Sequence, residues 1–236
     1  MRILPEFFLR DMHRALHAPS SVPPPKTAHY SAFLHNSLLS VATAFSDDPQ
    51  ISSMETRQKF ADEAKSYIEE ECSKPSISAV QALSVLASFY SGQGLQTLGF
   101  MYFGMSARIS QARELYVDSV TLVLMLYVVV GLGADCTQLV AAGRMKSRDL
   151  FDRYWCFHMG CAQDACWSLY VGREFGIPLG HNNDPHSLLA LADPDLDYMT
   201  WRRPDSDGQA QMCRTFTVFV WTCDLMKISR RIMDLM

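Results

Sequence analysis

The cysteine and histidine side chains around residue 160 are the first place in this sequence where metal or thiol chemistry could occur. Cys156, Cys161 and Cys166 stand five residues apart, with His158 among them, and thiolates and imidazoles are common zinc ligands. On a helix, steps of five residues turn the position by about 500°, so the three thiols fan around the axis instead of converging. No Cys-x-x-Cys pair occurs in the sequence. The spacing therefore favours core thiols and a hydrogen-bonded histidine over a zinc site.

Carboxylate pairs and glycine-rich turns, which can support acid–base or phosphate chemistry, are present only in weak form. The stretch His181–Asp184 offers a base and a carboxylate, but loops rich in Asn and Asp are mostly turns whose side chains bond nearby backbone. The GLGADC stretch at 131–136 is too short to cradle a phosphate and lacks a following Lys-Ser/Thr. Other carboxylates have no partner that the sequence identifies: Asp62, Glu63, Asp205 and Asp207. We therefore predict no catalytic, cofactor-binding, DNA-binding or metal-binding residue, and no enzyme.

The charges form no basic field that would attract nucleic acid or anionic lipid, because the net charge is −4. The basic pairs Arg202–Arg203 and Arg230–Arg231 are predicted to be solvated surface. The acidic run Glu69–Glu71 lies near the predicted end of a helix, where the helix macrodipole disfavours negative charge. A contact would explain that run, but a solvated helix end is the favoured interpretation.

Helices must position these side chains, because apolar residues recur at helical spacing along most of the chain. We find no alternating strand pattern and no repeat of fixed period. We therefore predict an all-α fold, a multi-helix bundle of antiparallel helix pairs around one core. The predicted helices cover residues 1–18, 29–45, 52–71, 77–90, 95–112, 147–172 and 214–236.

Local signals define several of the predicted helix ends. Ser52 with Glu55, and Ser78 with Gln81, have the spacing of capping boxes. The turn Ser91–Gly94 is so short that the helices on either side must form an antiparallel pair.

The apolar run DSVTLVLMLYVVVGLGADC, Asp118–Cys136, is the least typical part of the chain. Its uncharged stretch Ser119–Ala134 has 16 residues, fewer than the roughly 20 that a membrane-spanning helix needs. A buried strand would suit the residue types but would lack a pairing partner in an all-α fold. No membrane span is predicted.

Three motifs, in this order and spacing, resemble the middle homology region of fungal zinc-cluster transcription factors, also called the xylanolytic-activator regulatory region. They are Phe-Ser-Asp-Asp-Pro at Phe45–Pro49, Met-Tyr-x-Gly-Met-x-x-Arg at Met101–Arg108, and Trp-Ser-Leu-Tyr-x-Gly-Arg at Trp167–Arg173. The resemblance covers roughly residues 28–236. It implies an all-helical regulatory domain acting on transcription by RNA polymerase II in the nucleus. It also implies core positions for Met105, Trp167 and Tyr170, and a helix C-cap at Gly172.

The resemblance also bears on cofactors and partners. Members of the family read DNA through a separate N-terminal cluster of six cysteines with two zinc ions, and that pattern does not occur here. DNA contact is therefore expected only through such a missing domain, and no cofactor is expected in this chain. The implied partners are other transcription regulators or a second copy of the chain. The alternatives are a stand-alone helical interaction protein, a helical small-molecule binder, or a non-functional fragment of a gene model.

The resemblance defines the expected domain boundaries. Residues 1–27 are predicted to form an N-terminal helix and Pro-rich linker, and 28–236 the regulatory domain, truncated at its C-terminus. Family members usually pass directly from a helix like Arg108–Ala112 into a segment like Gly131–Gly143. Residues 113–130 are therefore a suspected insertion or retained intron.

Overall fold

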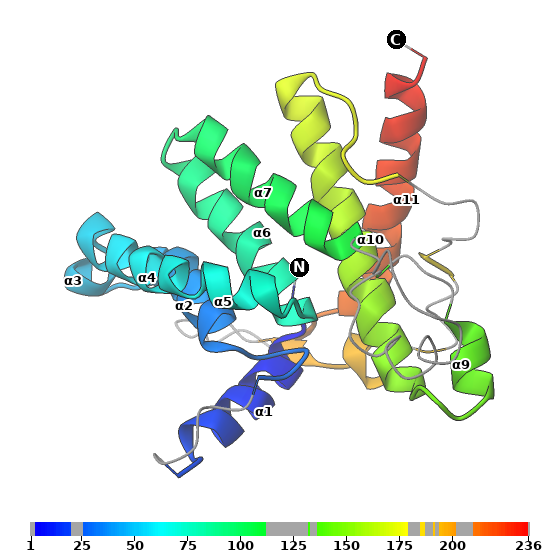
Figure 1. Cartoon of the computed structure of the whole chain (residues 1–236), viewed down its shortest axis with the longest axis horizontal. Helices are drawn as coiled ribbons and strands as arrows, with labels where there is room; N and C mark the ends of the chain where they lie inside the picture. Colours follow the sequence, from blue (N-terminus) through cyan, green and yellow to red (C-terminus); the bar gives the residue numbers. More distant parts are fainter. Residues whose placement is uncertain are drawn as a thin grey trace. The chain divides into compact units, whose positions relative to one another are not determined.

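The computed structural model describes residues 3–19, 26–111, 132, 136–178, 185–186, 191, 194–201 and 210–235, and the fold there is almost entirely helical (Figure 1). The chain divides into two compact units, Arg2–Leu132 and Gly133–Met236, each of which is described by itself. The predicted all-α class is confirmed, although the chain forms two compact units where a single bundle is expected. The suspected insertion at 113–130 lies outside the described residues.

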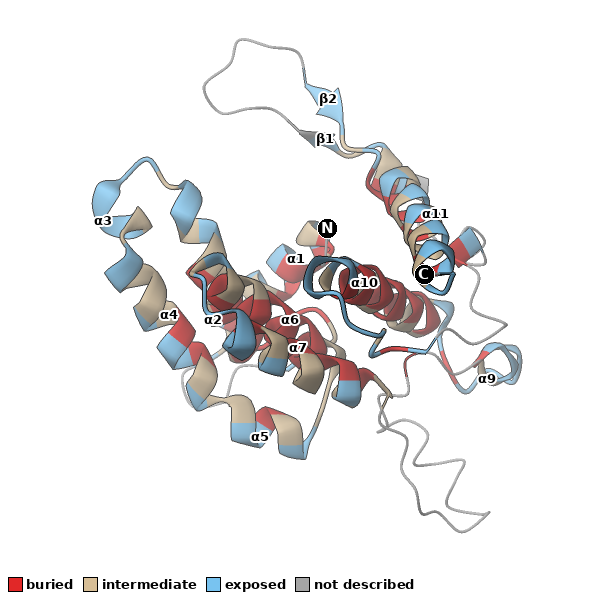
Figure 2. Ribbon diagram, turned by 90° about the horizontal axis from the view of Figure 1, so that it is seen from above, coloured by how far each residue is buried: buried red, intermediate tan, exposed pale blue. Residues whose placement is uncertain are grey.

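In the N-terminal unit, helix α2 packs against both α4 and α6, and α6 packs against α7. Figure 2 shows the buried surface of these helices turned toward one another. Phe33, Leu34, Leu83 and Leu86 are completely buried at the centre. The elements are α1 Pro5–Leu16, α2 Ala32–Ala42, the short helix η1 Thr43–Phe45, α3 Pro49–Ser52, α4 Met54–Ser66, α5 Ile68–Ser73, α6 Ile77–Gly92 and α7 Gln96–Gln111.

Helices α6 and α7 form the antiparallel pair that the short turn predicts. The Tyr90 and Tyr102 rings stack with centroids 5.4 Å apart, and the Ser106 hydroxyl donates to the Val80 carbonyl oxygen at 2.7 Å. Near the turn, the helices approach closely at Gly99, where an added Cβ would lie 2.7 Å from the Ala87 carbonyl oxygen. A glycine is therefore required at that crossing.

The helix caps of this unit are local, but two of them are not where the sequence predicts. Ser53, not Ser52, caps α4, and its hydroxyl accepts from the Thr56 amide at 3.2 Å. Ser76, not Ser78, caps α6. Each of these segments has two serines close together, and either could cap the helix according to its spacing. The residue at which the helix begins decides which serine is the cap.

The acidic run Glu69–Glu71 corrects a second prediction. Helix α4 ends at Ser66 and the run falls in the first turn of α5, where the macrodipole favours negative charge. Glu71 is buried and forms an ion pair with Lys26. Glu71 therefore marks a contact with the segment that precedes α2, whereas Glu69 and Glu70 are exposed, as the prediction of a solvated run expects.

The C-terminal unit is organised by two long helices, α10 and α11, which pack against each other. A two-residue antiparallel strand pair, β1 with β2, precedes α11. The elements are α9 Thr137–Ala141, α10 Ser147–Val171, the short helix η3 Pro194–Asp197, β1 Thr200–Trp201, β2 Gln211–Met212 and α11 Thr215–Met233.

Helices α10 and α11 run parallel, which corrects the prediction of antiparallel pairs throughout. Both helices rise in the same direction in Figure 1, α10 from green to yellow and α11 from orange to red. The long connection from Gly172 to Arg214 leaves enough chain to return to the starting end of α10, whereas a four-residue turn does not. Contacts join residues whose numbers increase together: Phe151 with Phe216, Trp155 with Phe219, and Asp164 with Arg230.

The residues of the third motif have mixed positions. Gly172 ends α10 with a left-handed backbone, φ 67°, as the C-cap prediction requires. Trp167 is half-buried, but Tyr170 is 71% exposed and is not a core residue of this unit. In the N-terminal unit, Met105 is partly buried against the hydrophobic core, as expected.

Candidate functional site between α10 and α11

The centre of the C-terminal unit contains a buried ion pair between Arg230 of α11 and Asp164 of α10. The Arg230 guanidinium donates to a carboxylate oxygen of Asp164 at 2.9 Å, and the two side chains are 9% and 4% exposed. The prediction that Arg230 is solvated is therefore wrong. Two adjacent arginines have the same sequence pattern whether they are solvated or form an ion pair. The carboxylate partner of Arg230 lies 66 residues away, so the local sequence does not reveal it.

The same two charged groups also hold the segment that follows α10. Asp164 accepts from the Gly176 amide at 3.0 Å and the Ile177 amide at 2.9 Å. Arg230 donates to the Ile177 carbonyl oxygen at 2.9 Å and stacks over the Phe175 ring. One buried pair thus fastens two helices and a loop, and its hydrogen bonds offset the cost of removing both charges from water.

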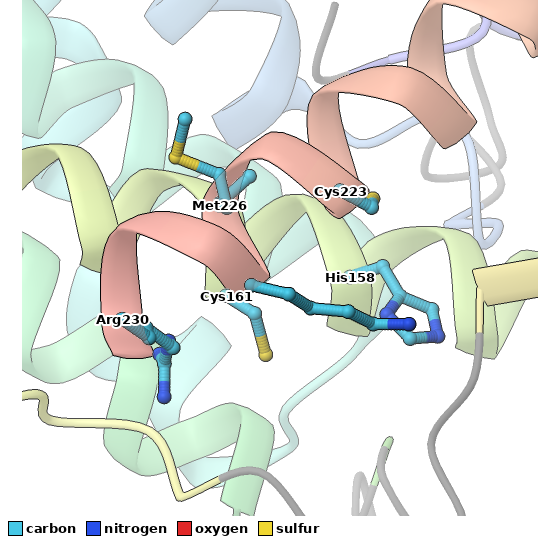
Figure 3. A pocket seen from close by; sticks show the side chains of 7 residues that line it. His158, Cys161, Cys223, Met226 and Arg230 are labelled. Carbon is cyan, nitrogen blue, oxygen red and sulfur yellow. The ribbon is translucent and has the colours of Figure 1, made fainter. Parts of the chain in front are cut away.

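A small cavity lies beside this ion pair. His158 and Cys161 from α10 face Cys223, Met226 and Arg230 from α11 across it (Figure 3). Its volume is about 20 Å³, which holds about one water molecule. Sites for drug-sized ligands measure about 300–1,000 Å³, so this cavity is too small for an inducer or coenzyme.

The thiols around the cavity are chemically quiet. Burial raises the pKa of Cys161 to about 12 and that of Cys223 to about 12. Cys156, on the same stretch of α10, has its pKa raised to about 12 for the same reason. These thiols are protonated at neutral pH, whereas the thiolate is the form that attacks electrophiles and binds metals.

Of the cysteine and histidine residues considered as zinc ligands, the structure brings His158 and Cys161 together at the cavity, where both pack between the helices. Among the described residues, no group of three or more His, Cys, Asp or Glu side chains is placed to hold a metal ion. Most of the other residues considered for acid–base or charge chemistry lie outside the described residues: 181–184, 202–203, Asp205 and Asp207. Among the described residues, the Asp62 carboxylate forms an ion pair with Lys65 and accepts a hydrogen bond from the Gln58 amide.

The start of α11 is capped from a distance. The Asp197 carboxylate, in η3, accepts from the Phe216 amide at 2.6 Å and from the Thr217 hydroxyl at 2.5 Å. Burial acts to raise the pKa of Asp197, but the hydrogen bonds from Thr217 and Phe216 outweigh it and lower that pKa. Arg214, at the N-cap position, makes no side-chain cap bond, so α11 depends on a residue that precedes it by almost twenty positions.

No helix within the described ranges is long and apolar enough to cross a membrane. The described part of the chain thus offers helix packing, a structural ion pair and a cavity the size of a water molecule.

Comparisons with known proteins agree with this description. The sequence model of the fungal-specific transcription factor domain matches residues 3–121, about half of the chain. The nitrogen assimilation transcription factor nit-4 of Neurospora crassa is 29% identical over 199 residues, which cover 81% of this chain and 16% of that protein. The chain thus corresponds to a small part of the curated relative's length. No solved structure matches the chain.

Proposed function

The chain belongs to the family of fungal-specific transcription factor domains, and from this membership we propose that it is part of a zinc-cluster-type factor that regulates transcription by RNA polymerase II in the nucleus. The family match over residues 3–121 carries this proposal. The similarity to nit-4, a protein named as a transcription factor, supports it. The chain is a regulatory domain and is not an enzyme, because its family is one of transcription factors.

We further propose that regulation works through contacts with other proteins. The cavity beside Arg230 has room for about one water molecule, so sensing of a small molecule there would require the helices to separate. The buried thiols are held in their protonated form. The outward face of α11, in contrast, is apolar and exposed, which is typical of an interaction surface.

A reporter assay tests the proposed function. The full chain is placed between a heterologous DNA-binding domain and an activation domain, and reporter mRNA is measured in a fungal host. We expect a several-fold change in output relative to a fusion that carries an unrelated helical protein of the same length. The Arg230→Met variant, which breaks the ion pair, should lose the effect.

Two controls make the result decisive. Fusion protein levels and nuclear fluorescence of a tagged chain are measured in parallel, so that loss of protein is not read as loss of regulation. An output equal to that of the unrelated spacer, at equal levels in the nucleus, would overturn the proposal.

A further inference from the structure

Helix α11 is apolar on two opposite faces. Its inward face, which includes Phe219 and Cys223, packs on α10. A helix that is apolar all round is normally buried all round. Yet the side chains of a second stripe, here called the outer stripe, are 52% to 67% exposed: Val218, Trp221, Leu225, Ile228 and Ile232.

The spacing of the outer stripe is that of a coiled coil. Successive members are separated by three, four, three and four residues, and Leu235, just beyond the helix end, continues the series. Apolar residues that alternate at three and four form the seam along which two helices pack knobs into holes. The inward residues Phe219, Cys223 and Arg230 fall at the other heptad positions, so α11 presents a separate seam outward.

We propose that the outer stripe is a dimerisation seam and that its occupant is the α11 helix of a second copy of this chain, packed antiparallel. A three-four seam is complementary to itself, so a twofold axis between Leu225 and Ile228 brings every layer into register. Leu225 then faces Ile228 of the second copy, and Trp221 faces Ile232. This inference does not depend on the proposed function.

Charge complementarity selects the antiparallel arrangement. The positions that flank the seam on one side are Asp224 and Arg231. In the antiparallel dimer, Asp224 of each copy lies opposite Arg231 of the other, which gives two ion pairs between opposite charges. In a parallel dimer in register, Asp224 would lie opposite Ser229, and no opposite charge within α11 would face Arg231.

Both charged residues are accessible to a second copy of the chain. Arg231 is exposed. Asp224 is partly exposed, and its carboxylate lies 3.1 Å from the His186 ring nitrogen and 3.8 Å from the Lys227 ammonium. Because α11 is already folded against α10, dimerisation does not bear the entropy cost of ordering the helix. A seam of this length can therefore suffice where an isolated peptide would not.

The test measures the association of the full chain by sedimentation equilibrium and light scattering over a wide concentration range. We expect a reversible dimer with a dissociation constant of about 1–10 μM. Leu225→Gln, at the centre of the seam, should weaken the dimer about 100-fold, because each dimer loses two buried leucines. Leu169→Gln is the matched control, since Leu169 of α10 is similarly exposed but lies off the stripe.

A mixing experiment tests the orientation. The Asp224→Arg chain alone places arginine opposite arginine, and the Arg231→Asp chain alone places aspartate opposite aspartate, so each should dimerise about tenfold or more weakly. In a one-to-one mixture, both pairs are again of opposite sign, and a heterodimer should form at the original strength. Residues 224 and 231 are about 10.5 Å apart along one helix, so the rescue cannot arise within a chain.

Three outcomes would overturn the proposal. They are a chain that stays monomeric at all concentrations, a dimer that Leu225→Gln leaves intact, and charge variants that mixing does not rescue. Hydroxyl-radical labelling of the Trp221 and Leu225 side chains separates the first outcome further. A monomer in which labelling of the stripe is blocked would show that another part of the same chain covers it.

Discussion

Helices α6 and α7 in the N-terminal unit and α10 and α11 in the C-terminal unit are both long helix pairs, but they are held together differently. The α6–α7 pair has a short turn, a close crossing at Gly99 and apolar contacts with α2. The α10–α11 pair is parallel, joined by a long connection, and fixed by the buried Arg230–Asp164 pair. A turn can set the register of an antiparallel pair, whereas a parallel pair needs specific contacts far apart in sequence.

The helix starts differ in the same way. In the N-terminal unit, serines next to each helix supply the caps of α2, α4 and α6. In the C-terminal unit, the cap of α11 comes from Asp197 in a preceding element. Because adjacent serines cap these helices of the N-terminal unit, substitutions elsewhere in the chain leave those caps in place. The cap of α11, in contrast, is lost when the single distant residue Asp197 is substituted.

The largest expected effect is the loss of the buried ion pair. Arg230→Met should destabilise the C-terminal unit by about 3–5 kcal/mol, because Asp164 is left buried without its counter-charge. All four tryptophans lie within residues 155–221, so tryptophan fluorescence during urea unfolding reports this unit. Arg144→Met, the same change at an exposed position, should shift the midpoint little. Equal stabilities of the two variants would show that packing alone holds the parallel pair.

The close crossing of the N-terminal unit gives the next effect. Gly99→Ala should destabilise the α6–α7 pair by about 1–3 kcal/mol, because the new methyl group meets the Ala87 backbone. Gly104→Ala, on the same helix with open space around it, should stabilise α7 by about 0.5–1 kcal/mol. Hydrogen exchange of the α6 and α7 amides measures both changes. Opposite signs are expected, and two stabilising changes would rule out a close crossing at Gly99.

The distant cap predicts a dependence on pH. Since hydrogen bonds lower the pKa of Asp197 in the folded state, its contribution to stability is complete above the unfolded pKa of about 3.9 and is lost as the pH falls below it. Asp197→Ala should cost about 2 kcal/mol at neutral pH. The variant should also lose less stability on acidification than the parent, as followed by tryptophan fluorescence. Parallel acid titrations of the two chains would refute the capping role.

The smallest effect tests a local cap. Ser53→Ala should destabilise α4 by about 1 kcal/mol, since the Thr56 amide loses its acceptor. Ser52→Ala, one residue earlier, should have an effect below about 0.5 kcal/mol. Thermal unfolding by circular dichroism compares the two variants, and the reverse order would restore the cap expected from sequence.

Local patterns predicted the elements well and the long-range contacts poorly. The all-α class, the α6–α7 pair and the end of α10 at Gly172 follow from periodicity, turn length and glycine chemistry. The direction of α11 does not, because a long connection permits either direction. The Arg230–Asp164 pair was missed because the sequence does not show which side of a helix will meet a carboxylate from another element.

The motif residues show the same limit. The resemblance suggested that Tyr170 belongs to the core, but its ring is mostly exposed while the backbone of Gly172, two residues later, is as expected. A backbone conformation is set by nearby residues, whereas burial depends on what packs against the helix. The predicted serine caps were wrong by one or two positions for a related reason. Neighbouring serines have similar spacing, and the sequence does not show at which residue the helix begins.

The parallel arrangement of α10 and α11 also has a consequence during synthesis on the ribosome. Helix α7 can pack on α6 as soon as it emerges, because only a short turn separates them. Helix α10 ends at Val171, whereas its partner α11 ends only at Met233. At a synthesis rate of about 5–20 residues per second, roughly 3–12 s pass between the completion of α10 and that of α11. During that interval the nascent chain presents Phe151 and Trp155 without their later partners. Until α11 is complete, this apolar face is a surface that a ribosome-associated chaperone can shield.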